Sequence, residues 1–146
     1  MSHENVEVVQ RVLRRFADED IEAALEDIAV DATLDWSNSD APDRGVYTGH
    51  EAWRAFFRSR DQVLAGRRIA ASELIAPTAN VVVLVARVSE QGRASGAAVQ
   101  ALGASVWTLH EGRVVSFKLY QSREQALEAL GLSGECGGVS PGPPSA

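Results

Sequence analysis

The chain has 146 residues, of which 45% are hydrophobic, and it carries 20 acidic against 14 basic residues, a formal net charge of −6 at pH 7. This length is typical of a single domain with one core, and the acidic balance argues against nucleic acid and anionic membrane surfaces as partners. The N-terminus carries no secretory signal pattern, and the longest apolar run, residues 81–86, is too short to span a bilayer. Cys136 is the only cysteine, so no intrachain disulfide or cysteine-based metal site is expected. We therefore expect a soluble, cytoplasmic protein.

The first part of the chain has a helical period. Residues 5–17 place apolar side chains at intervals of three and four, which predicts an amphipathic helix. Asp20 is a suitable N-cap for a second helix over residues 21–28. The segment ATLDW, residues 32–36, then alternates between apolar and polar positions, as a short strand does.

A third helix is predicted after a polar loop, residues 37–45, and a short extended piece, residues 46–47. Thr48 and Glu51 have the spacing of a capping box, in which each side chain satisfies a free N–H group at the helix start. An apolar stripe then follows at helical spacing, formed by Trp53, Phe56, Phe57 and Leu64.

The second half changes to a strand period. Four strands are predicted, at residues 68–76, 81–88, 94–109 and 114–120, with turns at 77–80, 90–93 and 110–113. Such short connections make neighbouring strands antiparallel. Ser122 and Gln125 then fit the start of a small C-terminal helix, and Gly131 suits its end. We expect one domain over residues 1–132, followed by a disordered tail rich in Gly, Pro and Ser over residues 133–146.

The order of these elements, helix, helix, short strand, helix and antiparallel meander, predicts an α+β fold with helices packed on one face of a bent sheet. The chain resembles the SnoaL-like polyketide cyclase branch of the NTF2-like superfamily. Three segments carry the resemblance: ENVEVVQRVLRRFADEDIEAALEDIAVDATLDW, GVYTGHEAWRAFF and VWTLHEGRVVSFKLYQSREQALEALGL. It implies an NTF2-like cone-shaped barrel, in which a curved antiparallel sheet packs on three helices from the N-terminal half, with a small C-terminal helix. It also implies a deep apolar cavity and a homodimer formed through the outer face of the sheet.

The family contains ketosteroid isomerases, polyketide cyclases, scytalone dehydratases and epoxide hydrolases, so the site must decide the function. Ketosteroid isomerases use a Tyr on the first helix, an Asp on the first strand and a second acid on the long strand. On this sequence the three positions fall on Val12, Trp36 and close to Ser105. Because these side chains supply no base, we do not expect ketosteroid isomerase activity.

Asp35 is the candidate catalytic base, although its inward orientation is open. Strand alternation puts Leu34 and Trp36 on one face and Thr33 and Asp35 on the other, and the apolar pair is the better inward face. Glu73 is the other carboxylate that a cyclase of this family could use.

An epoxide hydrolase would need an arginine between two acids. Arg87 is the candidate for that arginine, but no acid alternates beside it, and Glu90 falls in a predicted turn. The histidines are equally uninformative, because His50 lies in a predicted first helical turn and His110 in a predicted hairpin turn. Their separation gives no metal site, so we expect neither a metal nor a cofactor.

The expected cavity is lined mainly by aromatic side chains from separate elements, with a few polar groups among them. The residues we expect in its wall are Val12, Phe16, Trp36, Phe57, Gln100, Ser105, Trp107 and Tyr120. Two functions remain open. One is a cofactor-independent isomerase or cyclase that acts by proton transfer on a polyketide-, terpenoid- or steroid-like compound. The other is a non-catalytic module for ligand binding or dimerisation. In both, the partner is a small apolar or aromatic molecule.

Overall fold

The computed structural model describes residues 2–39 and 43–132. Its elements, in chain order, are α1 (Ser2–Ala17), α2 (Ile21–Leu25), β1 (Ile28–Asp35), β2 (Val46–Thr48), α3 (His50–Val63), β3 (Leu64–Thr78), β4 (Val81–Gly92), β5 (Ala98–His110), β6 (Arg113–Tyr120) and α4 (Arg123–Ala129). The tail that the sequence predicts to be disordered, residues 133–146, lies outside the described residues.

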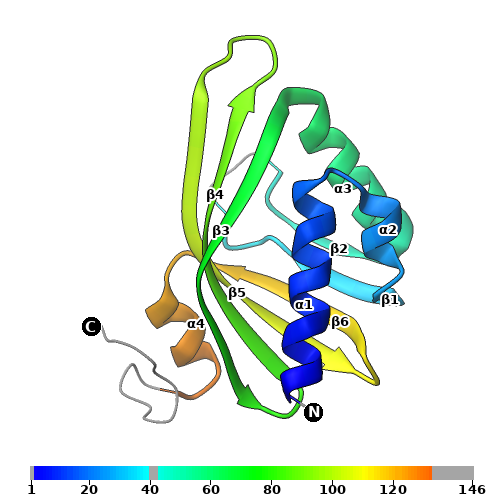
Figure 1. Cartoon of the computed structure of the whole chain (residues 1–146), viewed down its shortest axis with the longest axis vertical. Helices are drawn as coiled ribbons and strands as arrows, with labels where there is room; N and C mark the ends of the chain where they lie inside the picture. Colours follow the sequence, from blue (N-terminus) through cyan, green and yellow to red (C-terminus); the bar gives the residue numbers. More distant parts are fainter. Residues whose placement is uncertain (1, 40–42, 133–146) are drawn as a thin grey trace.

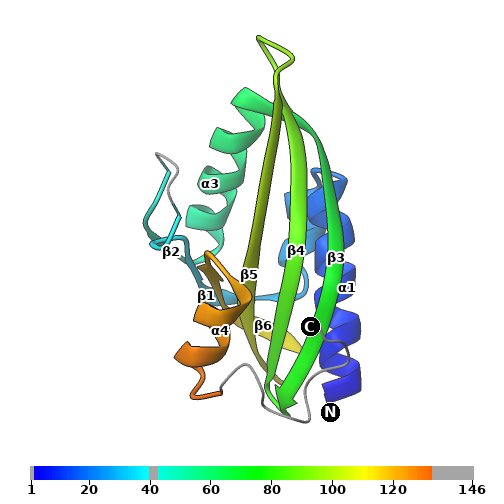
Figure 2. The same cartoon turned by 90° about the vertical axis from the view of Figure 1, so that its left-hand side faces the viewer.

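The strands form one curved sheet in the order β2-β1-β6-β5-β4-β3 (Figure 1). The four strands of the second half pair antiparallel with their chain neighbours, as their short turns predict. β1 departs from that pattern, because it pairs parallel with β6 while β2 pairs antiparallel with β1. The long strands β3, β4 and β5 bend along the length of the molecule, and the β4–β5 hairpin projects at one end (Figure 2). The expected α+β architecture with a curved sheet is thus confirmed.

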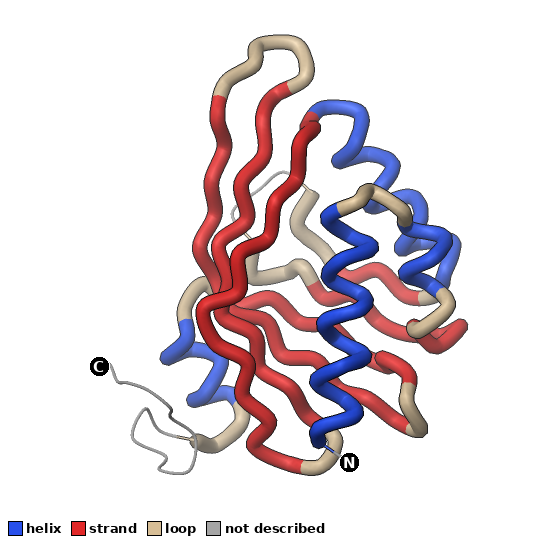
Figure 3. Tube along the Cα trace, viewed as in Figure 1, coloured by secondary structure: helices blue, strands red, loops and turns tan. Residues whose placement is uncertain are grey.

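The helices cover the sheet unequally. α1 packs across β3 and β4, α3 packs on β1, β2 and β3, and α2 lies between these two helices (Figure 3). Their side chains and the inward side chains of the sheet form the main core, which includes Val82 and Leu84 of β4. Val83, whose side chain alternates with these two, belongs instead to a second cluster with Ala126 of α4. α4 therefore covers part of the opposite face of the sheet.

Several local boundaries differ from the predictions, most of them because a strand is longer than its sequence pattern. Leu64, predicted in the apolar stripe of the third helix, is the first residue of β3, and β5 begins at Ala98 rather than at residue 94. The second helix ends at Leu25, since β1 already begins at Ile28. The capping box is absent: Thr48 pairs with Thr33 in the sheet, and the N-cap of α3 is Gly49, which has no side-chain cap. β4 continues through the predicted turn at residues 90–93 as far as Gly92. The cap of α4 is as predicted, with Ser122 accepting from the backbone N–H of Gln125.

None of the described helices is both long enough and apolar enough to cross a membrane.

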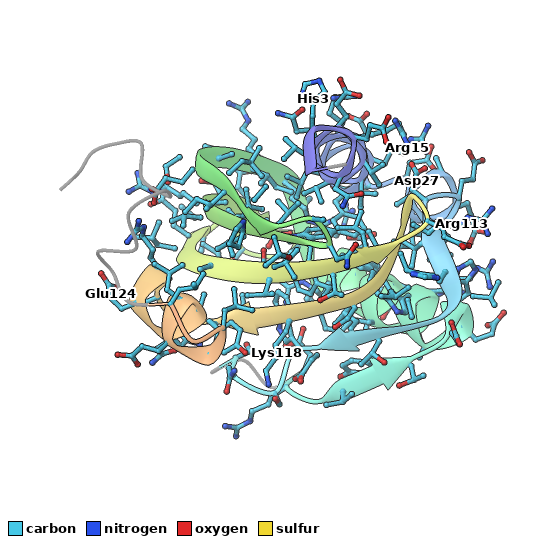
Figure 4. All side chains as sticks on the ribbon, turned by 90° about the horizontal axis from the view of Figure 1, so that it is seen from below. His3, Arg15, Asp27, Arg113, Lys118 and Glu124 are labelled. Atoms are coloured by element: carbon cyan, nitrogen blue, oxygen red, sulfur yellow. The ribbon has the colours of Figure 1, made fainter. Side chains whose placement is uncertain are left out.

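A cluster of charges joins α1 to the turn before β1. Arg11 donates two hydrogen bonds to Asp27, at 2.8 and 2.9 Å, and Arg15 donates a third at 3.3 Å. Figure 4 shows Asp27 close to Arg15 and Arg113 at one end of the molecule. The hydrogen bonds from Arg11 lower the pKa of Asp27, and partial burial opposes them without reversing the shift.

We expect Asp27→Asn to destabilise the fold by about 1–2 kcal/mol at neutral pH, a figure reduced for screening because Arg11 is partly exposed. Because the folded pKa of Asp27 lies below its unfolded value, this contribution is complete above about pH 4 and disappears as the pH falls through the folded pKa. Urea unfolding of both proteins between pH 7 and pH 2.5 measures the difference. The control is Asp31→Asn, which changes an exposed carboxylate of β1. An Asp27→Asn penalty that persists in acid would contradict this account.

Candidate functional site

A cavity of about 800 Å³ lies between the helices and the concave side of the sheet. Its wall draws on α1, α3, the end of β1 and the strands β3 to β6. Val99, Gln100 and Leu102, at the projecting end of β5, also belong to the wall, and all three are exposed to solvent. The cavity is therefore closed by core side chains at its base and reaches solvent beside the β4–β5 hairpin.

Aromatic rings in mutual contact form much of this wall. Trp36 stacks on Phe117 with 5.8 Å between ring centroids and meets the edge of Phe56 at 5.2 Å. On the α1 side, Phe16 lies 4.7 Å from Phe57 and 6.3 Å from Trp107. Such contacts hold the rings in fixed orientations, which gives the cavity a preformed apolar surface.

One part of the wall is charged. Arg67 of β3 donates from Nε to Glu90 of β4 at 2.9 Å and from Nη2 to Asp61 at 2.7 Å. Arg60 of α3 donates to the other oxygen of Glu90 at 3.2 Å and to Oδ2 of Asp43 at 2.8 Å. The side chains of Arg67 and Glu90 are only 6% and 3% exposed. This chain of five charged groups, which we call the acid–arginine network, joins α3 to β3, β4 and the loop before β2.

Two polar atoms beside this network have no hydrogen-bond partner among the described residues, although both are buried: Nε1 of Trp36 and Oδ1 of Asp43. Arg60 connects the two residues, because it donates to Asp43 and its guanidinium lies over the Trp36 ring at 5.5 Å from the ring centroid. The first atom can only donate and the second, in a carboxylate, can only accept. Buried polar atoms are normally paired, so unpaired atoms in a cavity wall mark a place where a ligand can bond.

Asp35 does not line the cavity. Its Oδ1 accepts from the backbone N–H and the hydroxyl of Ser37, and its Oδ2 lies 3.5 Å from Nζ of Lys118. Partial burial acts to raise the pKa of Asp35, but the bonds from Ser37 and the charge of Lys118 outweigh it, so the pKa lies below its ordinary value. In Figure 4 Lys118 lies on the side of the sheet away from α1. The geometry gives no support to Asp35 as a base in this cavity, whereas Leu34 and Trp36 both line it.

The other residues expected in the wall divide as follows. Phe16, Trp36, Phe57, Gln100, Ser105, Trp107 and Tyr120 line the cavity. Val12 is fully buried in the core and is not part of the wall. Ser105 accepts from the indole N–H of Trp107 at 2.9 Å, so Ser105 already has a partner. Tyr120, at the end of β6, also packs on the cluster that α4 covers.

Three further acids and bases considered from sequence lie outside the cavity wall. Glu73 accepts from Nε of Arg123 of α4 at 2.8 Å, so this carboxylate binds α4 rather than facing the cavity. Arg87 is exposed. His50 lies 2.7 Å from the backbone oxygen of Ile28, where it links α3 to β1. Among the described residues, no group of three or more His, Cys, Asp or Glu is placed to hold a metal ion.

Sequence reasoning missed the acid–arginine network. Glu90 was assigned to a turn, and the structure corrects this, because Glu90 is a buried residue of β4. Its spacing from Leu84, Ala86 and Val88, at intervals of two along β4, is the signal that could have placed it on the inward face. Asp43 and Arg60 carry no comparable signal, because a loop and a helix bring them together across 17 residues.

The comparisons with solved structures agree on the fold. An NTF2-like protein of unknown function from Burkholderia pseudomallei is 21% identical, with a TM-score of 0.71 over 86% of this chain and 95% of that one. TerC, co-crystallised with polyporic acid, is 22% identical, with a TM-score of 0.70 over 87% and 97%. SalBIII, an epoxide hydrolase/cyclase-like enzyme in pyran ring formation in the polyether salinomycin, is 22% identical, with a TM-score of 0.70 over 82% and 93%. No curated protein matches the chain.

The family comparison covers most of the domain. The model of the SnoaL-like domain matches residues 9–117, from the middle of α1 to the middle of β6, and so includes most of the cavity wall. This match identifies the chain as a member of the SnoaL-like domain family, and its curved sheet with helices has the same fold as the NTF2-like protein from Burkholderia pseudomallei.

Proposed function

We propose that the protein is a cofactor-independent enzyme that binds a small, mainly apolar compound of polyketide, terpenoid or steroid type and acts on it by proton transfer, with Asp43 as the base. The observation that carries the proposal is the state of the Asp43 carboxylate. It lies in the wall of an apolar cavity, Arg60 holds its Oδ2, and its Oδ1 has no partner among the described residues.

The chemistry follows from this arrangement. When a ketone lies in the cavity with a C–H bond next to its carbonyl, Oδ1 of Asp43 accepts that proton. The electron pair of the C–H bond moves toward the carbonyl oxygen and gives an enolate, while Asp43 becomes a carboxylic acid. Return of the proton from Asp43 to a different carbon of a conjugated enolate completes an isomerisation. When the enolate carbon instead attacks a second carbonyl and forms a ring, the new alkoxide takes the proton from Asp43, which restores the carboxylate. Neither outcome requires an oxidant or a further reactant.

The other residues of the acid–arginine network hold Asp43 in position. Arg60 also bonds Glu90, and Arg67 holds Glu90 from the other side. Arg60 is therefore fixed between two carboxylates, so its bond to Oδ2 holds the carboxylate of Asp43 in one orientation. Residues bound in this way preorganise a reactive group, because no reorganisation is needed when charge develops.

The names of similar proteins are consistent with a ligand cavity and with this class of reaction. TerC was crystallised with polyporic acid, and SalBIII is described as cyclase-like. At identities of 22% these two proteins support a shared fold only. Asp43 is assigned as the base from the cavity of this chain alone.

The test is exchange of α-protons in 2-tetralone, a bicyclic ketone, followed by NMR in deuterated buffer. We expect the wild-type protein to accelerate exchange above the buffer rate and Asp43→Asn to lose about 100-fold of that acceleration. Asp35→Asn is the matched control, because it removes a carboxylate near the cavity but outside its wall. Retained exchange in Asp35→Asn, with loss in Asp43→Asn, supports the proposal.

Two results would contradict it. If 2-tetralone binds without accelerated exchange, the cavity is a binding site and the protein a non-catalytic module for that ligand class. If Asp35→Asn loses the exchange and Asp43→Asn keeps it, the base has been assigned to the wrong acid. Binding is measured separately by equilibrium dialysis, so that a failure of binding is not mistaken for a failure of chemistry.

The homodimer and the cytoplasmic location expected from sequence also stay predictions. Light scattering coupled to gel filtration gives the mass in solution, and a mass near twice the chain's 15.6 kDa is the expected result.

A further inference from the structure

We infer that the cavity selects compounds that carry a phenolic or enolic hydroxyl, and that Nε1 of Trp36 and Oδ1 of Asp43 together bind this hydroxyl. The inference rests on the proposed function, because an enol is the form of a ketone that proton transfer at Asp43 produces, and a phenol is the same group locked in place.

The two unpaired atoms are one hydrogen-bond donor and one acceptor. The indole N–H of Trp36 is a donor without acceptor capacity, and a carboxylate oxygen is an acceptor without donor capacity. Both atoms are buried and without a partner among the described residues. A hydroxyl is the smallest group that satisfies both, since its oxygen accepts from the indole and its hydrogen is donated to the carboxylate. An ether oxygen or a carbonyl satisfies only the indole.

The charges around Asp43 also limit which ligand groups can bind there. An ammonium ligand would find Oδ2 of Asp43 already bonded to the guanidinium of Arg60 at 2.8 Å, and that same positive charge lies 5.5 Å from the centroid of the Trp36 ring. A carboxylate ligand would face the lone pairs of Oδ1, while Arg60 is already neutralised by Asp43 and Glu90. The charges at this place therefore disfavour both ions and leave a neutral donor–acceptor group as the best fit.

Aromatic rings surround the indole of Trp36. Trp36 is stacked on Phe117 and bordered by Phe56, so flat apolar surface adjoins the two polar atoms. The tryptophans elsewhere in the wall differ in their N–H groups: Trp53 donates to the backbone oxygen of Ala32 and Trp107 donates to Ser105. Among the three tryptophans of the chain, Trp36 alone has an indole N–H without a partner in the described part of the structure. An aromatic ring bearing its hydroxyl at one edge matches this combination.

The experiment compares 2-naphthol with 2-methoxynaphthalene, which share a ring system and differ in the hydroxyl hydrogen. Equilibrium dialysis gives both dissociation constants for each protein. We expect wild type to bind 2-naphthol about 10-fold more tightly or better, in line with a hydrogen bond to a charged acceptor. Trp36→Phe keeps a ring and removes the N–H, and Asp43→Asn keeps the shape and removes the charge. Each should reduce the preference about 5-fold.

Trp107→Phe is the matched control. It also replaces a tryptophan of the wall by a smaller ring, but its N–H is already bonded to Ser105, so the two affinities should change together and their ratio should stay. Circular dichroism melts establish that each variant is folded before the ratios are compared.

The outcomes separate this inference from the function on which it rests. Equal binding of both compounds by wild type overturns the hydroxyl site and leaves the cavity and its proton transfer standing. A preference that survives in both Trp36→Phe and Asp43→Asn overturns the assignment of the two atoms. Failure of wild type to bind either compound overturns the apolar ligand site itself, and the hydroxyl inference with it.

Discussion

Replacing Arg67 by methionine is expected to destabilise the protein by about 3–5 kcal/mol. The side chain of Arg67 is 6% exposed and makes three hydrogen bonds, to Glu90, to Asp61 and to the backbone oxygen of Phe16. Methionine keeps an unbranched apolar stem but is shorter and satisfies none of these groups. The largest loss comes from Glu90, which is 3% exposed and would remain buried with only Arg60 beside it.

The measurement is urea unfolding at pH 7, compared with Arg93→Met. Arg93 is 47% exposed, contacts Glu19 at 3.5 Å and donates from Nε to the backbone oxygen of Asp61, so these exposed contacts together are expected to contribute at most about 1–2 kcal/mol. The double variant Arg67→Met with Glu90→Leu should recover part of the loss, since it removes the stranded carboxylate together with its partner. A loss of stability no larger than that of Arg93→Met would show that Glu90 does not depend on Arg67 to compensate its buried charge.

This result bears on function because the network is also the support of Asp43. Arg67 holds Glu90, Glu90 holds Arg60, and Arg60 holds Asp43. A protein that keeps two buried charges, Arg67 and Glu90, in a mainly apolar wall bears a desolvation penalty that well-packed apolar residues would avoid. Their presence is therefore better explained by a role in the cavity than by stability.

Replacing Trp53 by alanine is expected to destabilise the protein by about 4 kcal/mol. Trp53 of α3 is fully buried, and its indole N–H donates to the backbone oxygen of Ala32 in β1 at 3.0 Å. The substitution removes the ring, leaves a cavity in the main core and removes one of the two hydrogen bonds to the Ala32 carbonyl, which keeps the bond from the backbone N–H of Gly49. α3 is the helix that carries Arg60, so loosening its contact with β1 should weaken ligand binding as well.

Urea midpoints measure this loss, and Trp53→Phe separates its parts. Phenylalanine keeps most of the apolar volume and loses the hydrogen bond, so we expect about 1–2 kcal/mol for that variant. Val46→Ala, at a position 57% exposed in β2, should change stability by less than about 0.5 kcal/mol. A loss in Trp53→Ala as small as that in Val46→Ala would mean that α3 is not anchored on β1 through this ring.

Local pattern was enough to predict much of the architecture. The period of residues 5–17 gave α1, and the alternating strands joined by short turns gave the antiparallel part of the sheet, because these features depend on neighbours in the chain. The alternation of Leu34 and Trp36 against Asp35 likewise predicted which two side chains would face inward. Periodicity works where one face of an element is apolar and the other is not.

The sequence by itself determined the fold class and the aromatic character of the cavity, since both follow from the spacing of apolar residues along single elements. Only the tertiary structure decided which acids stand in the wall. Asp43, Arg60, Arg67 and Glu90 lie on a loop, a helix and two strands, and their partners are 17 to 30 residues apart in the chain. No local period relates such positions, because a hydrogen bond between elements depends on how the sheet bends and where α3 lies upon it. For the same reason Asp35, the more conspicuous acid in sequence, is held on the other side of its strand by Ser37 and Lys118.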